Sequence, residues 1–493
     1  MFTRPAHILA AALLALPWLW PFTYGPTAAV EPYLVSAVVA ALLLALWPRS
    51  GHTAAIAAGG WLAAALVSSV IGLLQYFHLE ARLFPWVDGS VPGQAFGNLR
   101  QTNLLATLLV MGLLALRWWC VRVARPNMAA RIAALAAAAL LLTALAATAS
   151  RVGMVELVVL ALLALWWAFI EGRLRKPALI AVAVLAFYAL AALALPWLLQ
   201  HWQDVAGRDL LDRLEHAEST CGSRKILWRN VLHLISLHPW AGWGWGRLIY
   251  AHYITLYDGP RFCHILDNAH NLPLHLAVEL GVPAALAACA LALWLIWRGR
   301  PWAETDPARQ LAWGVLGAIA LHSMVEYPLW YGPFQIAALL CVGLLWRPRA
   351  FSGAWMAGAR VALAALLLAA CAYTAWDYRR ISQIYLQPSE RAPEYRDDPL
   401  AHARHSAVFA GAVRFADLTM QTPTRENAAW MLPLALQSLT YSPEPPVIER
   451  VIESASWLGQ DDLALAHMAR YKAAFPKDYR AWSARNRQAQ EPD

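Results

Sequence analysis

Charged residues are scarce in this chain. Only 14% of its 493 residues are Asp, Glu, Lys or Arg, whereas a soluble globular protein carries about 25%. Hydrophobic residues make up 60%, and the mean hydropathy is +0.44. This balance excludes an ordinary soluble protein and predicts an all-α polytopic membrane protein.

Motifs of several common chemistries are also missing. The sequence has no glycine-rich phosphate-binding loop with its lysine and no Gly-x-Ser-x-Gly nucleophile motif. No two histidines stand four apart beside carboxylates, and His270 and His275, five apart, belong to different helix faces. A nucleotide-dependent enzyme and a serine hydrolase are disfavoured, and no metal site is expected.

Apolar runs recur along the chain at the length that crosses a membrane, which is about 20 residues. Tryptophans lie at the ends of many of these runs, where an aromatic belt forms. We expect about eleven transmembrane helices, over residues 7–23, 32–48, 54–76, 103–121, 129–148, 153–171, 178–198, 272–297, 310–326, 331–346 and 358–376.

The basic residues predict the topology. With the N-terminus in the cytoplasm, every short loop on that side is basic, and the short loops opposite share one basic residue, Arg151. We therefore interpret the net charge of +8 as a topology signal and not as a nucleic-acid surface. The segment 199–271 and the tail from Asp377 then lie outside, which predicts the inner membrane of a Gram-negative cell with both segments in the periplasm.

This order predicts four parts. Residues 1–198 hold about seven transmembrane helices, and a large periplasmic loop, 199–271, is expected to be catalytic because loops of this length are usually functional. Residues 272–376 hold about four more transmembrane helices, and 377–493 form a small soluble helical tail with TPR-like hairpin spacing. The first apolar run is short and contains Pro17; we expect a membrane helix there, with a cleaved signal peptide as the alternative.

The stretch Asp267–Pro283, DNAHNLPLHLAVELGVP, joins a polar lead to an apolar helix. Gly281-Val282-Pro283 predicts a break in this helix before a second apolar run, 284–297. His270 sits at the junction, where Asn268 or Asn271 could cap the helix. Polar residues at the mouth of a membrane helix usually mark a site. His270 is therefore a candidate catalytic residue, and the simpler interpretation is that it caps the helix.

Three further polar groups interrupt the outer ends of the predicted helices. An arginine at membrane depth costs roughly 2.5–3.5 kcal/mol on insertion scales, so it should face protein, water or an anion. The candidate residues are Arg100, Gln101 and Asn103; Ser150 and Arg151; and Glu326 and Tyr327. The alternatives are ordinary helix caps for the first group, an arginine that extends to the membrane interface for the second, and a hydrogen-bond partner for the third.

The loop 199–271 adds cations and two cysteines. Arg224 and Arg229 can bind phosphate oxygens with two donors each, and Lys225 as a point charge; a solvated basic face is the alternative. Cys221 and Cys263 could form a disulfide in an oxidising compartment or remain free thiols.

Taken together, these residues resemble a known family. Ser150-Arg151, the loop ending HPWAGWGWG, and His270 followed by Gly281 resemble the O-antigen ligase/polymerase superfamily. Within it, GNLRQTNLLATLL and HSMVEYPLWY look like the bacterial protein O-oligosaccharyltransferases of the PglL type. The resemblance covers about Gly97 to Trp346, and Thr102 departs from it where proline is expected.

The resemblance implies a metal-independent glycosyl transfer without cofactor. The donor would be an oligosaccharide on undecaprenyl pyrophosphate, and the acceptor a Ser or Thr hydroxyl of a periplasmic or pilin-like protein. His270 would assist the hydroxyl. From their chemistry, we expect Arg151, Arg224, Arg229 and Arg100 to hold the pyrophosphate. By resemblance, Gln101 and Tyr327 contact donor or acceptor. We expect the same of Asn103, Asn271 and Glu326, and Glu326 could orient His270 or an arginine.

Other functions stay open at this point. An O-antigen ligase acting on the lipid A core would share the fold and the histidine, and a polysaccharide polymerase is a third reading. A transporter of lipid-linked sugars is a non-enzyme alternative. A transporter tends to break its helices at mid-membrane, whereas the polar residues here gather at one predicted face.

Overall fold

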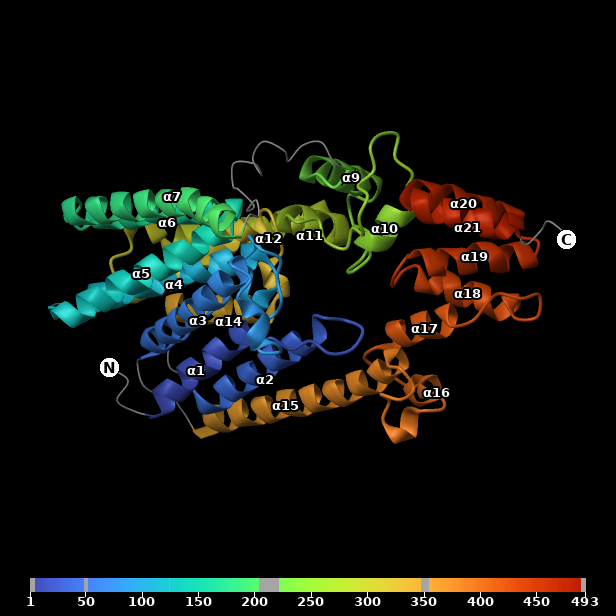
Figure 1. Ribbon diagram of the computed structural model, residues 1–493, viewed down its shortest axis with the longest axis horizontal. Helices are drawn as coiled ribbons and strands as arrows, with labels where there is room; N and C mark the ends of the chain where they lie inside the picture. The colour runs from blue at the N-terminus through green and yellow to red at the C-terminus, as the bar shows by residue number, and fades with distance from the viewer. Residues whose placement is uncertain (1–4, 48–51, 124, 204–220, 347–353, 489–493) are drawn as a thin grey trace. The chain divides into compact units, whose positions relative to one another are not determined.

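The computed structural model describes residues 5–47, 52–123, 125–203, 221–346 and 354–488, and within these ranges it contains helices and no strand (Figure 1). This confirms the predicted all-α class. The helices before the tail are α1 Pro5–Leu19, α2 Val30–Leu46, α3 Thr53–Tyr76, α4 Thr102–Arg122, α5 Met128–Ala147, α6 Arg151–Ile170, α7 Arg175–Gln203, α9 Arg224–Leu237, α10 Leu248–Ile254, α11 Leu272–Leu280, α12 Val282–Gly299, α13 Pro307–Ser323, α14 Gly332–Leu345 and α15 Ala354–Ser382.

Seven stretches among the described residues are long and apolar enough to cross a membrane. They are Thr53–Tyr76, Thr102–Arg122, Met128–Ala147, Arg151–Ile170, Arg175–Trp202, Val282–Ala303 and Trp355–Tyr385, and α1, α2 and α14 are shorter apolar helices. The expected count of eleven therefore remains a prediction.

The run 272–297, predicted as one span with a break at Gly281 to Pro283, forms two helices. α11 ends at Leu280, Gly281 has φ +90°, and α12 begins at Val282. The first apolar run also ends earlier than expected, at Leu19. The middle of the segment 199–271, residues 204–220, lies outside the described residues.

Short polar side chains define where many of these helices begin. Asn127, Ser150, Ser223, Asn271 and Asp306 each accept a hydrogen bond from a backbone N–H in the first turn of α5, α6, α9, α11 and α13. Such caps satisfy donors that the helix itself leaves unpaired. Two of the capped starts, at Ser150 and Asn271, coincide with the polar groups predicted to mark a site.

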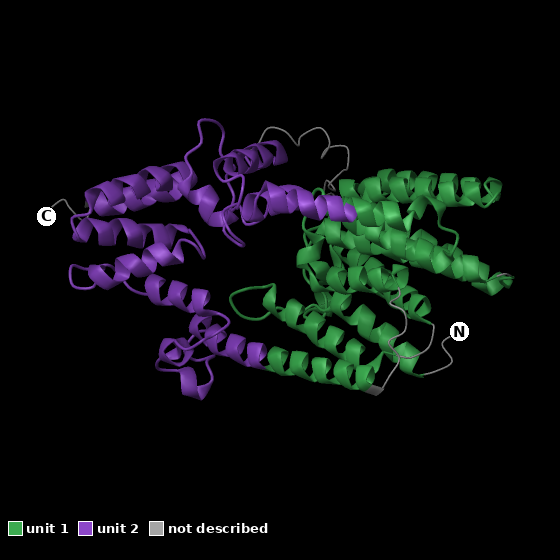
Figure 2. Cartoon of the chain, turned by 180° about the vertical axis from the view of Figure 1, so that it is seen from behind, with its two compact units in different colours: residues 1–216, 293–372 green, residues 217–292, 373–493 purple. Residues whose placement is uncertain are grey.

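The chain divides into two compact units, which are described separately (Figure 2). Unit 1 is Met1–His216 with Leu293–Ala372, and unit 2 is Ala217–Ala292 with Tyr373–Asp493. Unit 2 thus includes the predicted loop from residue 217 onward together with the predicted tail, and the four predicted parts stay a prediction.

Unit 1 is a helical bundle in which α4 contacts α3, α5, α6 and α13. Small residues allow close helix approach, as is typical of membrane bundles. A Cβ on Gly112 of α4 would lie 2.4 Å from Cβ of Ala65 of α3, and one on Gly60 of α3 would lie 2.9 Å from the carbonyl oxygen of Ala11 of α1. Large side chains such as Trp18 and Trp61 are fully buried among these helices.

Unit 2 combines α9, α10 and α11 with the tail helices. These are α16 Pro399–Ala403, α17 Ala410–Thr419, α18 Ala428–Ser438, α19 Pro445–Trp457, α20 Asp461–Ala474 and α21 Pro476–Gln488, and α17 to α21 pack in chain order (Figure 1). Tyr253 of α10 is buried in the tail's core, and its hydroxyl lies 2.8 Å from Nδ1 of His467. The tail is therefore packed against the segment that leads to His270.

Candidate functional site

The turn that carries His270 is held by its neighbours in unit 2. His270 is half-buried with φ +49°, and its backbone N–H donates to Oδ1 of Asn268 at 2.9 Å. Asn271 caps α11 by accepting from the N–H of Leu274 at 3.0 Å. The indole of Trp228 on α9 donates to the carbonyl of Ala269 at 3.1 Å. The backbone is therefore fixed on both sides of His270.

His275, the other histidine of this stretch, has a different environment. It is buried, its Nδ1 accepts from the N–H of Ala269 at 3.4 Å, and its Nε2 lies 3.4 Å from Oε2 of Glu279. Burial and the charge of His270 lower the pKa of His275 to about 4. It is a neutral residue that supports the turn, and sequence analysis did not assign it a role.

Glu279 continues this support. Burial raises the pKa of its carboxyl, and the backbone N–H groups of Gly246, Leu248 and Arg247 oppose that shift. These N–H groups belong to the start of α10 and the turn before it. One carboxylate thereby joins the end of α11 to the start of α10.

The glycines of HPWAGWGWG and of GVP meet in unit 2. The N–H of Trp243 donates to the carbonyl of Val278, the N–H of Gly244 to that of Glu279 and the N–H of Val282 to that of Pro239, all at 2.8–2.9 Å. A Cβ on Gly281 would lie 2.1 Å from the carbonyl oxygen of Trp240. A Cβ on Gly242 would lie 2.4 Å from the carbonyl oxygen of Glu279. Two backbones touch here, which explains why this pattern contains glycine.

The two predicted arginines of unit 2 lie on different sides of α9. Arg224 is partly buried and one turn before Trp228, so it shares the face that reaches Ala269. Arg229 is exposed and shares a face with Lys225. The disulfide Cys221–Cys263 is present, with 5.5 Å between the Cα atoms, and links the residues before α9 to the segment before His270.

In unit 1, Asn103, Ser150 and Glu326 come together from three parts of the chain. Oγ of Ser150 donates to Oδ1 of Asn103 at 2.7 Å, and Nδ2 of Asn103 donates to Oε1 of Glu326 at 3.4 Å. Ser150 also caps α6, whose first residue is the exposed Arg151. Three of the sequence-predicted positions therefore form one hydrogen-bonded cluster.

A second polar contact lies deeper in the same bundle. Oγ1 of Thr107 on α4 lies 2.8 Å from Oε1 of Glu156 on α6 and 2.8 Å from Nδ1 of His322 on α13. Glu156 and His322 are both 0% exposed. Because a hydroxyl has one hydrogen, one of these neighbours must donate to Thr107. Sequence analysis missed this trio, although an acid inside an apolar run is itself a signal.

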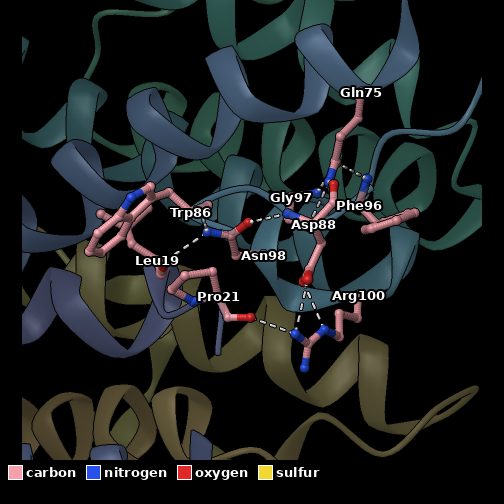
Figure 3. Close-up of polar contacts among 9 residues, drawn as sticks. All are labelled: Leu19, Pro21, Gln75, Trp86, Asp88, Phe96, Gly97, Asn98 and Arg100. Atoms are coloured by element: carbon pink, nitrogen blue, oxygen red, sulfur yellow. Dashed lines mark hydrogen bonds and ion pairs between the residues drawn. The ribbon is translucent and has the colours of Figure 1, made fainter. Parts of the chain in front are cut away.

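Arg100 is held within the connection between α3 and α4 (Figure 3). Its Nε donates to Oδ2 of Asp88 at 2.7 Å, and its Nη2 donates to Oδ1 of Asp88 at 3.0 Å and to the carbonyl of Pro21 at 2.5 Å. Asp88 offsets the charge of Arg100. The other predicted arginines are therefore the stronger candidates for an anion.

Gln101 and Tyr327 are the remaining predicted positions. Gln101 precedes α4, and its buried Oε1 has no hydrogen-bond partner among the described residues. Tyr327 stacks on Tyr331 with 6.0 Å between ring centroids and 19° between planes. Among the described residues, no group of three or more His, Cys, Asp or Glu could hold a metal ion.

Comparison with known proteins shows which families this chain resembles. Three family models match the chain: Protein glycosylation ligase over 95–119, O-Antigen ligase over 136–289, and Virulence factor membrane-bound polymerase, C-terminal, over 310–490. They confirm the resemblance to the protein O-oligosaccharyltransferase type of the O-antigen ligase/polymerase superfamily.

A particular relative points the same way. The General O-oligosaccharyltransferase of Acinetobacter baylyi is 23% identical over 296 residues, which are 57% of this chain and 49% of that protein. The chain thus spans about half the length of this curated relative.

Proposed function

We propose that this protein transfers an oligosaccharide from undecaprenyl pyrophosphate to Ser or Thr hydroxyls of periplasmic or pilin-like proteins. The observation that carries this proposal is the position of the protein-glycosylation match, 95–119, which contains Gln101 and Asn103. The O-antigen ligase match, 136–289, contains Arg151, Arg224 and His270.

His270 assists the acceptor in this proposal. The acceptor hydroxyl needs a group that takes or orients its proton near neutral pH, which suits an imidazole. The hydroxyl oxygen attacks the anomeric carbon of the donor sugar while the bond from that carbon to the pyrophosphate oxygen breaks. His275 is unsuited to this role because it is buried and its pKa is lowered.

Fixed cations would stabilise the departing pyrophosphate, whose charge grows as the bond breaks. Arg224 is supported by its shared face with Trp228, which holds the residue before His270. Arg151 and Arg229 are exposed guanidiniums that can bind phosphate oxygens, and Arg100 would contribute less because Asp88 pairs with it.

The remaining predicted residues would contact donor or acceptor. They are Gln101, Asn103, Asn271, Glu326 and Tyr327. The hydrogen bonds that join Asn103, Ser150 and Glu326 support a common role for this group. The proposal includes eleven spans in the inner membrane, a cytoplasmic N-terminus, and a periplasmic site and tail.

An O-antigen ligase is the second candidate, because the match that includes His270 carries that description. Its acceptor would be the lipid A core. A polymerase is a third candidate, since the polymerase model matches 310–490. The transfer test therefore needs all three acceptors.

Purified full-length protein would receive undecaprenyl-pyrophosphate oligosaccharide with a pilin-type protein, lipid A core or a second lipid-linked oligosaccharide, all in EDTA. His270→Ala is the test variant and His275→Gln the matched histidine control. We expect glycosylated pilin from the wild type and a loss of about 10²–10⁴-fold in rate for His270→Ala, with a smaller loss for the control.

Transfer to the lipid A core alone would move the assignment to a ligase. Elongated lipid-linked glycan would move it to a polymerase. If protein that still binds the donor forms no product with any acceptor, a transporter of lipid-linked sugars becomes the better interpretation.

A further inference from the structure

A pocket of about 610 Å³ opens in the connection between α3 and α4 of unit 1. This is within the range of small-molecule sites, roughly 300–1,000 Å³. It lies in the same connection as Arg100 and Gln101, yet none of the predicted site residues lines it. The lining residues used below are His78, Glu80, Phe84, Ser90, Val91 and Phe96.

The loop around this pocket is fixed by buried amides (Figure 3). Gln75 of α3 donates to the carbonyls of Asp88 and Gly97 and accepts from the N–H groups of Phe96 and Gly97, at 2.7–3.2 Å. Asn98 donates to the carbonyls of Leu19 and Trp86 at 2.8 and 3.0 Å. A loop held in this way binds a ligand at a low entropic cost.

The polar groups of the pocket are mainly acceptors. Glu80 is 1% exposed; its Oε1 accepts from the N–H of Ser90 at 2.9 Å, and its buried Oε2 has no hydrogen-bond partner among the described residues. Nδ1 of His78 lies 3.1 Å from the carbonyl of Ser90 and 3.3 Å from Oε1 of Glu80. Both neighbours are acceptors, so Nδ1 carries a hydrogen and points away from the ligand, and Nε2 is the ring nitrogen left to interact with it.

The hydroxyl of Ser90 fits the same pattern, because it donates to the carbonyl of Gln94 at 2.9 Å and keeps its lone pairs. A carboxylate repels phosphate, so this is not the place for the pyrophosphate. The walls are apolar at Val91 and Phe96, and Phe84 is 77% exposed. The matching ligand has many hydroxyl donors around an apolar ring face.

We propose that this pocket binds a sugar ring of the oligosaccharide donor. Ring hydroxyls donate to Glu80, His78 and Ser90, and the C–H face of the ring packs on Phe84. The assignment of the sugar to the donor rests on the proposed transferase function. The pocket's affinity for a free oligosaccharide does not depend on turnover.

The test measures binding of the host's lipid-linked oligosaccharide after mild acid has released it from the lipid. Purified full-length protein would be titrated by saturation-transfer NMR as wild type, Glu80→Gln and Phe84→Ala. Glu394→Gln and Phe169→Ala are matched controls, because Glu394 and Phe169 are exposed and do not line the pocket. Phe84→Ala alters an exposed side chain and should leave the fold intact.

We expect each pocket variant to weaken binding by about three- to tenfold, which is the size of one hydrogen bond or one aromatic contact. In the transfer assay, KM for the donor should rise by a similar factor. Inhibition by undecaprenyl pyrophosphate, which has no sugar, should stay unchanged.

Oligosaccharide binding that is the same in both pocket variants and in wild type would overturn the proposal. Displacement of the oligosaccharide by an acceptor peptide would assign the pocket to the acceptor instead. If the wild type transfers glycan but both variants bind the oligosaccharide as well as the wild type does, the pocket proposal is refuted and the transferase proposal stands. If both variants weaken oligosaccharide binding but the wild type transfers no glycan, the transferase proposal is refuted and the pocket proposal stands.

Discussion

At the scale of single residues, the two arginines of α9 should differ in effect. Arg224 is partly buried on the face of Trp228, and Arg229 is exposed on the face of Lys225. We expect Arg224→Ala to lower kcat/KM by about 10²–10³-fold, the usual cost of removing a group that stabilises developing charge. Arg229→Ala should cost less than about fivefold, because exposed charges are screened.

Initial transfer rates at two salt concentrations would check this. Lys225→Ala is the control for net charge, and Arg224→Lys should recover part of the rate because it keeps a point charge. A larger loss for Arg229→Ala than for Arg224→Ala would contradict the assignment.

Gly281 and Gly246 offer a matched pair of glycines with positive φ. Gly281 has φ +90° and would place a Cβ 2.1 Å from the carbonyl oxygen of Trp240, whereas Gly246 has φ +71° and nothing within 4 Å of its Cβ. Gly246→Ala should cost about 1–2 kcal/mol from backbone strain alone. Gly281→Ala should cost clearly more, because the two backbones must separate.

Thermal unfolding of both variants in detergent would measure this difference. Equal shifts in Tm would show that the close approach to Trp240 adds nothing to the destabilisation caused by Gly281→Ala.

At the scale of helices, Thr107 joins α4, α6 and α13 at one polar point inside an apolar bundle. Thr107→Val would leave Glu156 and His322 without this partner and should cost about 1–3 kcal/mol, the penalty for buried polar groups that lose a hydrogen bond. Glu156→Gln keeps an oxygen at hydrogen-bond distance and should cost less.

Thr143→Val is the matched control, because the Thr143 hydroxyl donates to the carbonyl of Ala139 in its own helix at 2.8 Å. Tm in detergent measures the effect. If Thr143→Val lowered Tm as much as Thr107→Val, the contacts of Thr107 between the three helices would add nothing to the stability.

At the scale of the whole molecule, acid should unfold unit 2. Burial lowers the pKa of His252 to about 3 and of His275 and His467 to about 4, from 6.5 in the unfolded chain. The unfolded state therefore binds more protons below about pH 6.5, and stability falls as the pH drops from 6.5 towards 4. Three such groups give a slope of up to about 4 kcal/mol per pH unit near pH 5.

Thermal melts of the full chain between pH 7.5 and 5 would record this slope. His467→Gln keeps an acceptor for the Tyr253 hydroxyl and should reduce the slope by about one third. A Tm that is flat over this range would contradict the neutral, buried state of these histidines.

The sequence was sufficient for what depends on local pattern. Apolar runs located the helices, and the polar interruptions located Asn103, Ser150 and Glu326, which meet in the structure. The residues that break the helix at Gly281 could be recognised in the sequence, but the contact with Trp240, 41 positions away, could not. Pairings such as Thr107 with His322 and Arg100 with Asp88 also depend on tertiary structure, so the sequence named some of these residues but not their partners.

The Cys221–Cys263 bond has a consequence for the biogenesis of the protein. A bond of this kind forms in an oxidising compartment, and the reducing cytoplasm prevents it. It closes the segment that contains α9 and α10 just before His270. In the topology that we propose, this segment lies in the periplasm, so newly made chains would complete it only after export, through the cell's thiol-oxidising machinery. A host that lacks that machinery would accumulate inserted protein that has its membrane helices but is immature at His270.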